Sequence, residues 1–212
     1  MGDKFVLLVE GKDDEHVVKN LMHRHSFGDL PKIKPKDGID NLLGTLDVEL
    51  EGSDLVALGI LVDADVSLDA RWTRIKQILT DSGYNSIPDV VPLEGLILVQ
   101  GSKPIFGAWL MPNNILNGIL EDFLQYLVPN GEGNVLLSIA RSTVKGLPEE
   151  SSLPPEEKRF AAIHESKAII YTWLAWQESP GKPFGISITA KFLDANANEA
   201  TILINWLRNL FH

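Results

Sequence analysis

The sequence has no cysteine among its 212 residues. Disulfides, zinc–thiolate sites, iron–sulfur clusters and cysteine nucleophiles are therefore excluded. It also has no run of about 18 or more apolar residues, so no transmembrane helix is expected. Its start, MGDKFVLLVEGKDD, is a poor signal peptide because acids follow a short apolar run. We expect a cytoplasmic protein with no membrane partner.

Basic residues are too few to balance the acidic ones. The chain has 19 Lys and Arg against 29 Asp and Glu, a formal net charge of −10. This balance argues against a broad nucleic-acid-binding face that works by counterion release. A small local face is still open, because residues 19–36 have a basic bias, although a solvated helix face and loop explain that bias equally. The Gly-x-Gly-x-x-Gly and Walker patterns of nucleotide-binding loops are absent as well.

The first hundred residues alternate between strand and helix patterns. Apolar runs predict strands at 4–9, 55–62, 88–91 and 96–100, and helical spacing predicts helices at 13–25, 39–51 and 69–82. The loop at 26–38 holds a short strand around Ile33. Such alternation predicts an α/β fold with a mostly parallel sheet flanked by helices.

The second half of the sequence is mainly helical. Helices are expected at 113–127, 156–176 and 197–211, with an exposed loop at 145–157. We therefore expect an α/β core at 1–105 and a helical C-terminal elaboration at 106–212, packed together as one structural unit. The tryptophans at 109, 173, 176 and 206 are expected to pack the helices on the sheet rather than to stack bases.

Acidic residues follow two of the predicted strands. Glu10 ends the first strand, and Asp63 and Asp65 end a later, all-apolar one. Ligands of open α/β sheets bind at the carboxyl ends of the strands, so we expect these carboxylates to meet there. The alternation in Asp-x-Asp places both carboxylates on one side of an extended backbone. Oxygen ligands without cysteine or a histidine pair favour Mg²⁺ or Mn²⁺.

The residues after Glu10 have several explanations. Gly11 permits a tight turn, and with Lys12 it gives a substrate phosphate close access to the backbone. Asp13 is the expected N-cap of the first helix. A single acid after a strand is ordinarily a cap or a loop residue, but two apolar strands that each end in acid favour a metal site.

These two motifs resemble those of the TOPRIM domain, which occurs in topoisomerases, bacterial primases, OLD-family nucleases and RecR-like proteins. The first motif here is Val9-Glu10-Gly11-Lys12-Asp13-Asp14, and the second is Val62-Asp63-Ala64-Asp65. The resemblance covers residues 4 to 100. Later stretches, among them GAWLMPNN and KAIIYTWLAWQ, resemble small uncharacterised bacterial TOPRIM-like proteins related to the OLD type.

The resemblance implies roles for particular residues. Glu10 is expected in general acid/base chemistry or metal binding, Asp63 and Asp65 in binding Mg²⁺, and Asp14 in binding a second ion. OLD-type nucleases also use later acids and a lysine, for which the candidates are Glu121, Asp122 and Lys167. A solvent-exposed helix face explains Glu121 and Asp122 equally well, and a surface lysine is the ordinary expectation for Lys167.

The function implied is Mg²⁺-dependent phosphodiester chemistry on DNA or RNA, carried out by a nuclease, which is a hydrolase. A non-catalytic metal-binding module in a DNA repair, defence or RNA-processing complex is the first alternative. The long OLD-type proteins carry an ATPase domain that is missing from this sequence, so an ATPase or another protein is a possible partner.

Two alternatives use Asp63 differently. In a receiver domain of two-component signalling, Asp63 is the phosphoacceptor and Lys103 its partner, but Gly11 then interrupts the expected acid pair. In a HAD-like phosphatase, ILVDADVS is the catalytic strand end, which leaves Glu10 unexplained. His23, His25 and His164 are not spaced as metal ligands and are expected to be structural.

Overall fold

The structure is a computed structural model that describes residues 4–212. Its strands are β1 (Phe5–Val9), β2 (Lys32–Pro35), β3 (Ala57–Asp63), β4 (Leu96–Leu98) and β5 (Ile105–Met111). Its helices are α1 (Lys12–Arg24), α2 (Ile39–Gly44), α3 (Leu46–Leu50), α4 (Leu68–Asp81), α5 (Leu120–Tyr126), α6 (Val135–Lys145), α7 (Glu165–Ala175), α8 (Phe184–Thr189) and α9 (Asn198–Phe211). Short 3-10 turns lie at Gly131–Gly133, Glu150–Ser152 and Ala162–His164.

The strands form one mostly parallel sheet. Within residues 4–212 the sheet has five strands in the order β2-β1-β3-β5-β4, and only the edge strand β4 is antiparallel to its neighbour. The predicted α/β fold, with helices flanking the sheet and further helices toward the C-terminus, is confirmed. Of the helices in the described part of the chain, none is both long and apolar enough to cross a membrane.

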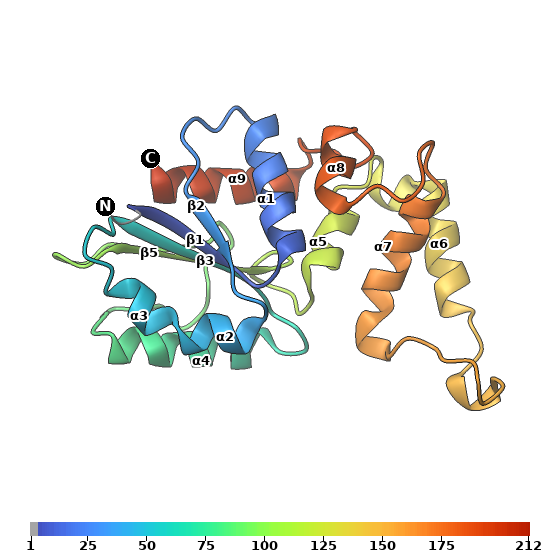
Figure 1. The fold of residues 1–212 in the computed structure, drawn as a ribbon, viewed down its shortest axis with the longest axis horizontal. Helices are drawn as coiled ribbons and strands as arrows, with labels where there is room; N and C mark the ends of the chain where they lie inside the picture. Colours follow the sequence, from blue (N-terminus) through green and yellow to red (C-terminus); the bar gives the residue numbers. More distant parts are fainter. Residues whose placement is uncertain (1–3) are drawn as a thin grey trace.

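Helices cover both faces of the sheet (Figure 1). Successive residues of a strand point to opposite faces, so Leu7 and Val9 pack with α1 and α9, while Val6 and Leu8 pack with the layer of α2, α3 and α4. β3 is buried along nearly its whole length, as its all-apolar sequence predicts for a strand covered on both faces. Together, the hydrophobic cores on the two faces of the sheet hold the carboxyl ends of the central strands beside the first turn of α1.

Helix α9 lies close to the sheet because of two glycines. Gly59 of β3 and Gly107 of β5 are paired neighbours, and together they leave a flat area under Leu210 of α9. A Cβ atom at Gly107 would lie 2.5 Å from Leu210 Cδ2, and one at Gly59 would lie 2.8 Å from it. The last helix of the chain is thus part of the α/β core, in contact with β3 and β5.

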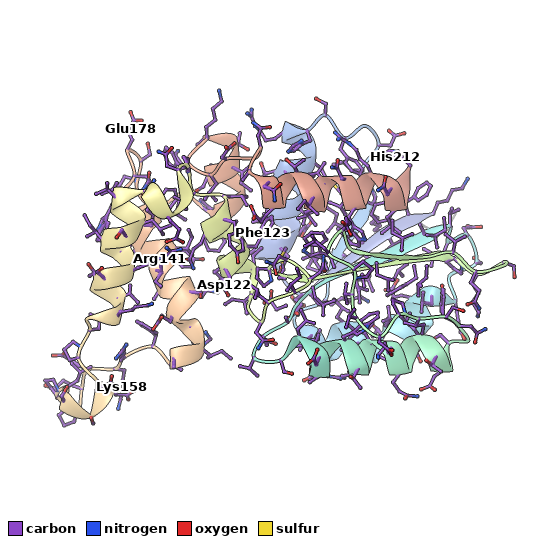
Figure 2. All side chains as sticks on the ribbon, turned by 180° about the vertical axis from the view of Figure 1, so that it is seen from behind. Asp122, Phe123, Arg141, Lys158, Glu178 and His212 are labelled. Atoms are coloured by element: carbon purple, nitrogen blue, oxygen red, sulfur yellow. The ribbon has the colours of Figure 1, made fainter. Side chains whose placement is uncertain are left out.

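Helices α6 and α7 pack against each other and project from one end of the sheet (Figure 1). Figure 2 shows α5, with Asp122 and Phe123, where this pair joins the body. Trp173 is buried in the pair and donates its ring N–H to Asn134 Oδ1 at 3.2 Å. Trp109 and Trp206 are buried as predicted, whereas Trp176 is 40% exposed.

Several predicted element boundaries are wrong in the second half of the chain. The helix expected at 113–127 begins only at Leu120, because Asn113 Oδ1 accepts the backbone N–H groups of Ile115 and Leu116 and holds that segment in a turn. The helix expected at 156–176 begins at Glu165, after the 3-10 turn Ala162–His164.

Other differences lie in the first half of the chain and at the expected division. The helix expected at 39–51 is interrupted at Thr45, whose hydroxyl donates to Asn41 O at 2.9 Å. Residues 88–91 form no strand, and β5 was not predicted although it lies beside β3. Because β5 crosses the expected division after residue 105 and α9 lies beyond it, the α/β core draws on both sides of that division.

Candidate functional site

The residues after β1 begin helix α1. Gly11 is the N-cap, and Asp14 Oδ2 accepts its backbone N–H at 2.9 Å, so Asp14 rather than Asp13 caps this end. Gly11 has φ of −140°, which any residue can adopt, and an added Cβ would meet only Asp14 Oδ2 at 3.5 Å. The chain bends at Glu10 and Gly11, but in a conformation that does not require glycine, so what the glycine offers is an open approach to its backbone.

Backbone N–H groups hold two of the predicted acids in place. Glu10 Oε1 accepts the N–H of Asp63 at 2.7 Å, across the adjacent ends of β1 and β3. Asp63 Oδ1 in turn accepts the N–H of Leu120, the first residue of α5, at 2.9 Å. The convergence of Glu10 and Asp63, expected from the parallel strand ends, is confirmed.

Helices α5 and α7 add an ion pair to this region. Glu121 is buried in the first turn of α5, at 5% exposure, and does not lie on the solvent face. Lys167 of α7 places its Nζ 3.0 Å from Glu121 Oε1, with its own side chain 46% exposed. Glu121 and Lys167, which the resemblance gave only as candidates, thus lie at the same site as Glu10 and Asp63.

These side chains line one open pocket of about 300 Å³. Its acidic lining residues are Glu10, Asp13, Asp14, Asp37, Asp63 and Glu121, and its basic ones are Lys12 and Lys167. Six carboxylates therefore face two ammonium groups within this lining. We call this cavity the acidic pocket.

Crowding and burial change the acidity of the pocket. Burial is the main cause that raises the pKa of Asp63 well above its ordinary value, and the charges of Asp14, Glu10 and Glu121 add to it. Burial, with the charges of Glu10 and Glu121, raises the pKa of Asp14 to about 7 despite its bond to Gly11. Burial also raises the pKa of Glu10, against the lowering effect of the Asp63 N–H. The acidic side chains of the lining thus carry more negative charge than Lys12 and Lys167 neutralise.

The acidic pocket has the donor set of a hard divalent cation. Glu10, Asp63 and Glu121 each have one oxygen bonded within the protein, and across residues 4–212 the other has no protein donor. Trp109 Nε1 is the one fully buried unpaired side-chain nitrogen or oxygen in that range, so these second oxygens reach solvent. Oxygen-only ligation suits Mg²⁺ or Mn²⁺. No three such side chains of the described chain already surround a common point, so binding requires them to turn inward.

Asp65 does not line the acidic pocket. It lies just after β3 with φ of 52°, so the backbone of Asp63-Ala64-Asp65 is not extended and the two carboxylates do not project together. Its carboxylate forms an ion pair with Arg71 of α4, and Arg71 Nε also donates to Asp63 O at 2.9 Å. The expected extended Asp-x-Asp backbone is not formed. Asp65 stays near enough for its charge to contribute to the raised pKa of Asp63 and Glu10, but its ion pair with Arg71 fixes the loop after β3.

Asp122 also has a local role. Its Oδ2 accepts the N–H of Ile119 at 2.9 Å, which caps α5, and its Oδ1 accepts the hydroxyl hydrogen of Ser166 at the start of α7. It is absent from the lining of the acidic pocket. Asp122 therefore joins α5 to α7 and positions their neighbours Glu121 and Lys167.

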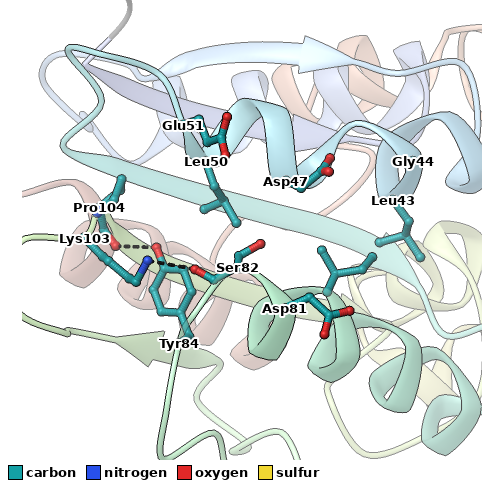
Figure 3. A pocket seen from close by; sticks show the side chains of 11 residues that line it. Leu43, Gly44, Asp47, Leu50, Glu51, Asp81, Ser82, Tyr84, Lys103 and Pro104 are labelled. Atoms are coloured by element: carbon teal, nitrogen blue, oxygen red, sulfur yellow. Dashed lines mark hydrogen bonds between the residues drawn. The ribbon is translucent and has the colours of Figure 1, made fainter.

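Lys103 lies far from Asp63. In the parallel pair β3–β5, Asp63 is level with Met111 and Ala57 with Ile105, so Lys103 stands at the opposite end. Six residues of strand separate these ends, about 20 Å. Figure 3 shows Lys103 in a separate pocket of about 490 Å³, where its Nζ donates to Ser82 O at 2.7 Å. The pairing that a receiver domain needs is not formed.

Sequence reasoning missed two parts of the site. Arg71 is one turn into α4, where a helical arginine looks like an ordinary surface residue. Asp37 enters the pocket because the N–H groups of Lys36 and Gly38 bond to the end of β1, at Val9 O and Glu10 O. No pattern in the loop expected at 26–38 predicts that contact. Lys34 and Lys36, which contribute to the basic bias of residues 19–36, form ion pairs with Glu49 of α3.

Comparison with known proteins places the whole described chain in one family. A family model described as "Protein of unknown function (DUF3226)" matches residues 4–212. The chain belongs to the DUF3226 family. No curated protein and no solved structure matches it. The match spans the sheet, both helical layers and the α6–α7 pair of this DUF3226 protein, so all the elements that line the acidic pocket lie within it.

The raised pKa of Asp14 predicts an unusual pH dependence of stability. In the folded protein Asp14 keeps its proton up to about pH 7, whereas in the unfolded chain it releases the proton near its ordinary pKa of 3.8. The stability that the bound proton contributes is therefore complete below pH 3.8 and is lost as the pH rises through about 7. Without divalent ions, Asp14→Asn should therefore be stabilising at pH 8 by at most about 4 kcal/mol, at 1.36 kcal/mol per pKa unit.

Urea unfolding of the wild type and Asp14→Asn between pH 4 and 8 measures this effect. The asparagine keeps an oxygen for the Gly11 N–H. Asp69→Asn, at an exposed position of α4, is the matched control and should follow the wild type at every pH. Parallel curves for the wild type and Asp14→Asn would show that Asp14 is not protonated in the folded protein.

Proposed function

We propose that this protein is a Mg²⁺- or Mn²⁺-dependent phosphodiesterase that acts on nucleic acid, a nuclease of the TOPRIM type. The observation that carries the proposal is the meeting of Glu10, Asp14, Asp63 and Glu121 at the carboxyl ends of β1 and β3. The first three of these come from the two TOPRIM-like motifs, and the fourth comes from a helix about 60 residues further along the chain.

Asp14, Asp63 and Glu121 are the residues we assign to hold metal. Their oxygens reach one cavity. Burial, with a smaller contribution from neighbouring carboxylates, raises the pKa of Asp14 and Asp63, and a bound divalent cation would favour their ionised forms. Such an ion supplies Lewis-acid polarisation of a phosphodiester and a water of lowered pKa. Asp65 and Asp122 are left out of this set, since Arg71, Ser166 and the Ile119 N–H engage them.

Lys167 and Lys12 supply the positive charge that a phosphate needs. Partial burial acts against the charge of Lys167, but the bond and charge of Glu121, with Tyr171 and Asp13, raise its pKa overall. Lys167 is therefore an ammonium at neutral pH and suits binding of a phosphate oxygen, not proton abstraction. Lys12 is exposed at the pocket rim, beside the open Gly11 backbone.

Glu10 is the residue we assign to move a proton. Its Oε1 is held by the Asp63 N–H, while its Oε2 has no protein donor within residues 4–212. Burial raises its pKa above the ordinary value, and the open Oε2 faces the cavity in which the reaction would occur. This assignment keeps the acid/base role that the TOPRIM resemblance implies for Glu10.

The experiment is a cleavage assay with purified wild-type protein. Labelled single- and double-stranded DNA and RNA are incubated with Mg²⁺, with Mn²⁺, and with a chelator. We expect metal-dependent cleavage of at least one substrate that the chelator stops, and that Glu10→Gln, which keeps the Asp63 contact, lacks. Metal binding without cleavage of any substrate would favour the non-catalytic module; cleavage unchanged by the chelator would refute the metal-dependent reaction.

A further inference from the structure

A second pocket adjoins the acidic pocket. It has a volume of about 450 Å³ and is lined by Asp13, Tyr171, Leu174, Ala175, Lys182 and Pro183, with Gly181 at its edge. Asp13 lines both pockets, so they share a wall. Helix α8 begins directly after Pro183 and packs on α1, and the lining residues come from the start of α1, from α7 and from the segment before α8. We call it the tyrosine pocket.

Helix α7 connects the two pockets along one face. Lys167 and Tyr171 are four residues apart on α7, which places them one above the other. Lys167 lines the acidic pocket and Tyr171 the tyrosine pocket. A ligand with a phosphate at Lys167 therefore has its next chemical group beside Tyr171.

The tyrosine pocket offers a flat aromatic wall. Tyr171 is 44% exposed although its ring packs on Phe184, with centroids 4.8 Å apart. This packing fixes the tyrosine ring and leaves part of it open to the cavity. Leu174, Ala175 and Pro183 supply the apolar surroundings. A volume of this size and a fixed aromatic surface suit a planar ring such as a nucleobase.

The lining of the tyrosine pocket contains one acidic and one basic side chain, Asp13 and Lys182. At the shared wall, the carboxylate of Asp13 repels phosphate, but it accepts hydrogen bonds from base amino groups and ribose hydroxyls. Lys182 also lines the cavity, has no ion-pair partner among residues 4–212, and lies with its Nζ 6.0 Å from the Phe192 ring centroid. The two pockets together thus offer the cation of Lys167, the carboxylate of Asp13, the ring of Tyr171 and the cation of Lys182.

We propose that the tyrosine pocket binds the nucleobase next to the phosphate held in the acidic pocket, by stacking on Tyr171, and that Lys182 contacts the following phosphate. This inference rests on the proposed function for the phosphate in the acidic pocket. It narrows the substrate to a nucleic acid with an unpaired base at that position, because a base within a duplex cannot enter a side pocket. Single strands and frayed ends meet this requirement.

The test uses short single-stranded oligonucleotides in which one base at a time is replaced by fluorescent 2-aminopurine. They are titrated with the full chain in Ca²⁺ in place of Mg²⁺. We expect quenching of fluorescence at one position and a loss of affinity when that position is abasic. Tyr171→Ala should abolish the quenching and weaken binding by about 5- to 150-fold, the range for one base–aromatic stack. Tyr171→Phe keeps the ring and should retain both.

Tyr126→Ala, a half-exposed tyrosine on α5 outside both pockets, is the matched control and should behave as the wild type. Equal affinities for abasic and intact oligonucleotides, or quenching that survives in Tyr171→Ala, would overturn the base pocket, as would no binding at all. Equal cleavage rates for the wild type and Tyr171→Ala would refute the base pocket but not the proposed function. Position-specific quenching without any cleavage would support the base pocket and refute the reaction.

Discussion

Asp63→Asn should lower the affinity for Mg²⁺ or Mn²⁺ by at least about 100-fold. Mutation of residues that only hydrogen-bond to a metal ligand already lowers metal affinity by about 10- to 100-fold, and loss of a ligand should cost at least as much. Metal-dependent cleavage should fall by a similar or larger factor. The asparagine can still accept the N–H of Leu120 with its Oδ1, so α5 and Glu121 keep their places. The expected loss therefore comes from the missing negative charge and not from a displaced helix. Calorimetric titration with Mn²⁺ measures the first effect, and cleavage rates measure the second.

Stability measurements separate this effect from unfolding. Asp63 has a pKa raised well above its ordinary value by burial and by neighbouring carboxylates, so its neutral replacement should be at least as stable as the wild type without metal at pH 8. Asp69→Asn, on the exposed side of α4, should bind metal as the wild type does. Undiminished metal binding by Asp63→Asn would remove the basis of the proposed site.

Asp65→Asn provides a direct comparison between the two aspartates of the second motif. Because Asp65 pairs with Arg71 and does not line the acidic pocket, its substitution should change metal affinity much less than Asp63→Asn does. Equal losses for the two variants would mean that the loop after β3 rearranges on metal binding and brings Asp65 inward.

Trp206→Ala should destabilise the fold by about 3–5 kcal/mol, the usual cost of removing a buried aromatic ring from a core. Trp206 of α9 is 1% exposed, lies 5.8 Å from Trp109 between ring centroids, and donates its ring N–H to Leu96 O at 2.9 Å. Gly95 leaves room for the ring, since a Cβ there would lie 2.4 Å from Trp206 Cδ1. Urea unfolding followed by circular dichroism measures the change.

Trp176→Ala is the matched control for this prediction. Trp176 is 40% exposed at the end of α7, so its removal should cost about 1 kcal/mol or less, as surface substitutions do. A small loss for Trp206→Ala would mean that α9 is dispensable to the sheet, contrary to its close packing on Gly59 and Gly107.

The architecture of the first hundred residues could be predicted because its signals are local. The apolar runs of β1 and β3 and the helical spacing of α1 and α4 lie within windows of 5 to 14 residues, and the structure has all four elements there. The parallel sheet followed from their alternation. The sequence of β5, IFGAWLM, has no turn residue and no periodicity that would distinguish a strand from a short helix. Its pairing with β3 makes this segment a strand.

From the sequence, the ends of two apolar strands place Glu10 and Asp63 at the same edge of a parallel sheet. The structure adds that β1 and β3 are neighbours in that sheet, so that the two residues touch. Tertiary structure alone decided the rest of the acidic pocket. Glu121 and Asp122 are adjacent in sequence, yet capping uses Asp122 and leaves Glu121 to face Lys167. Asp63 and Asp65 differ likewise, since a left-handed residue and Arg71 direct Asp65 away. The division of roles between Asp122 and Glu121 depends on Ser166 and Lys167, more than 40 residues away, which no local pattern encodes.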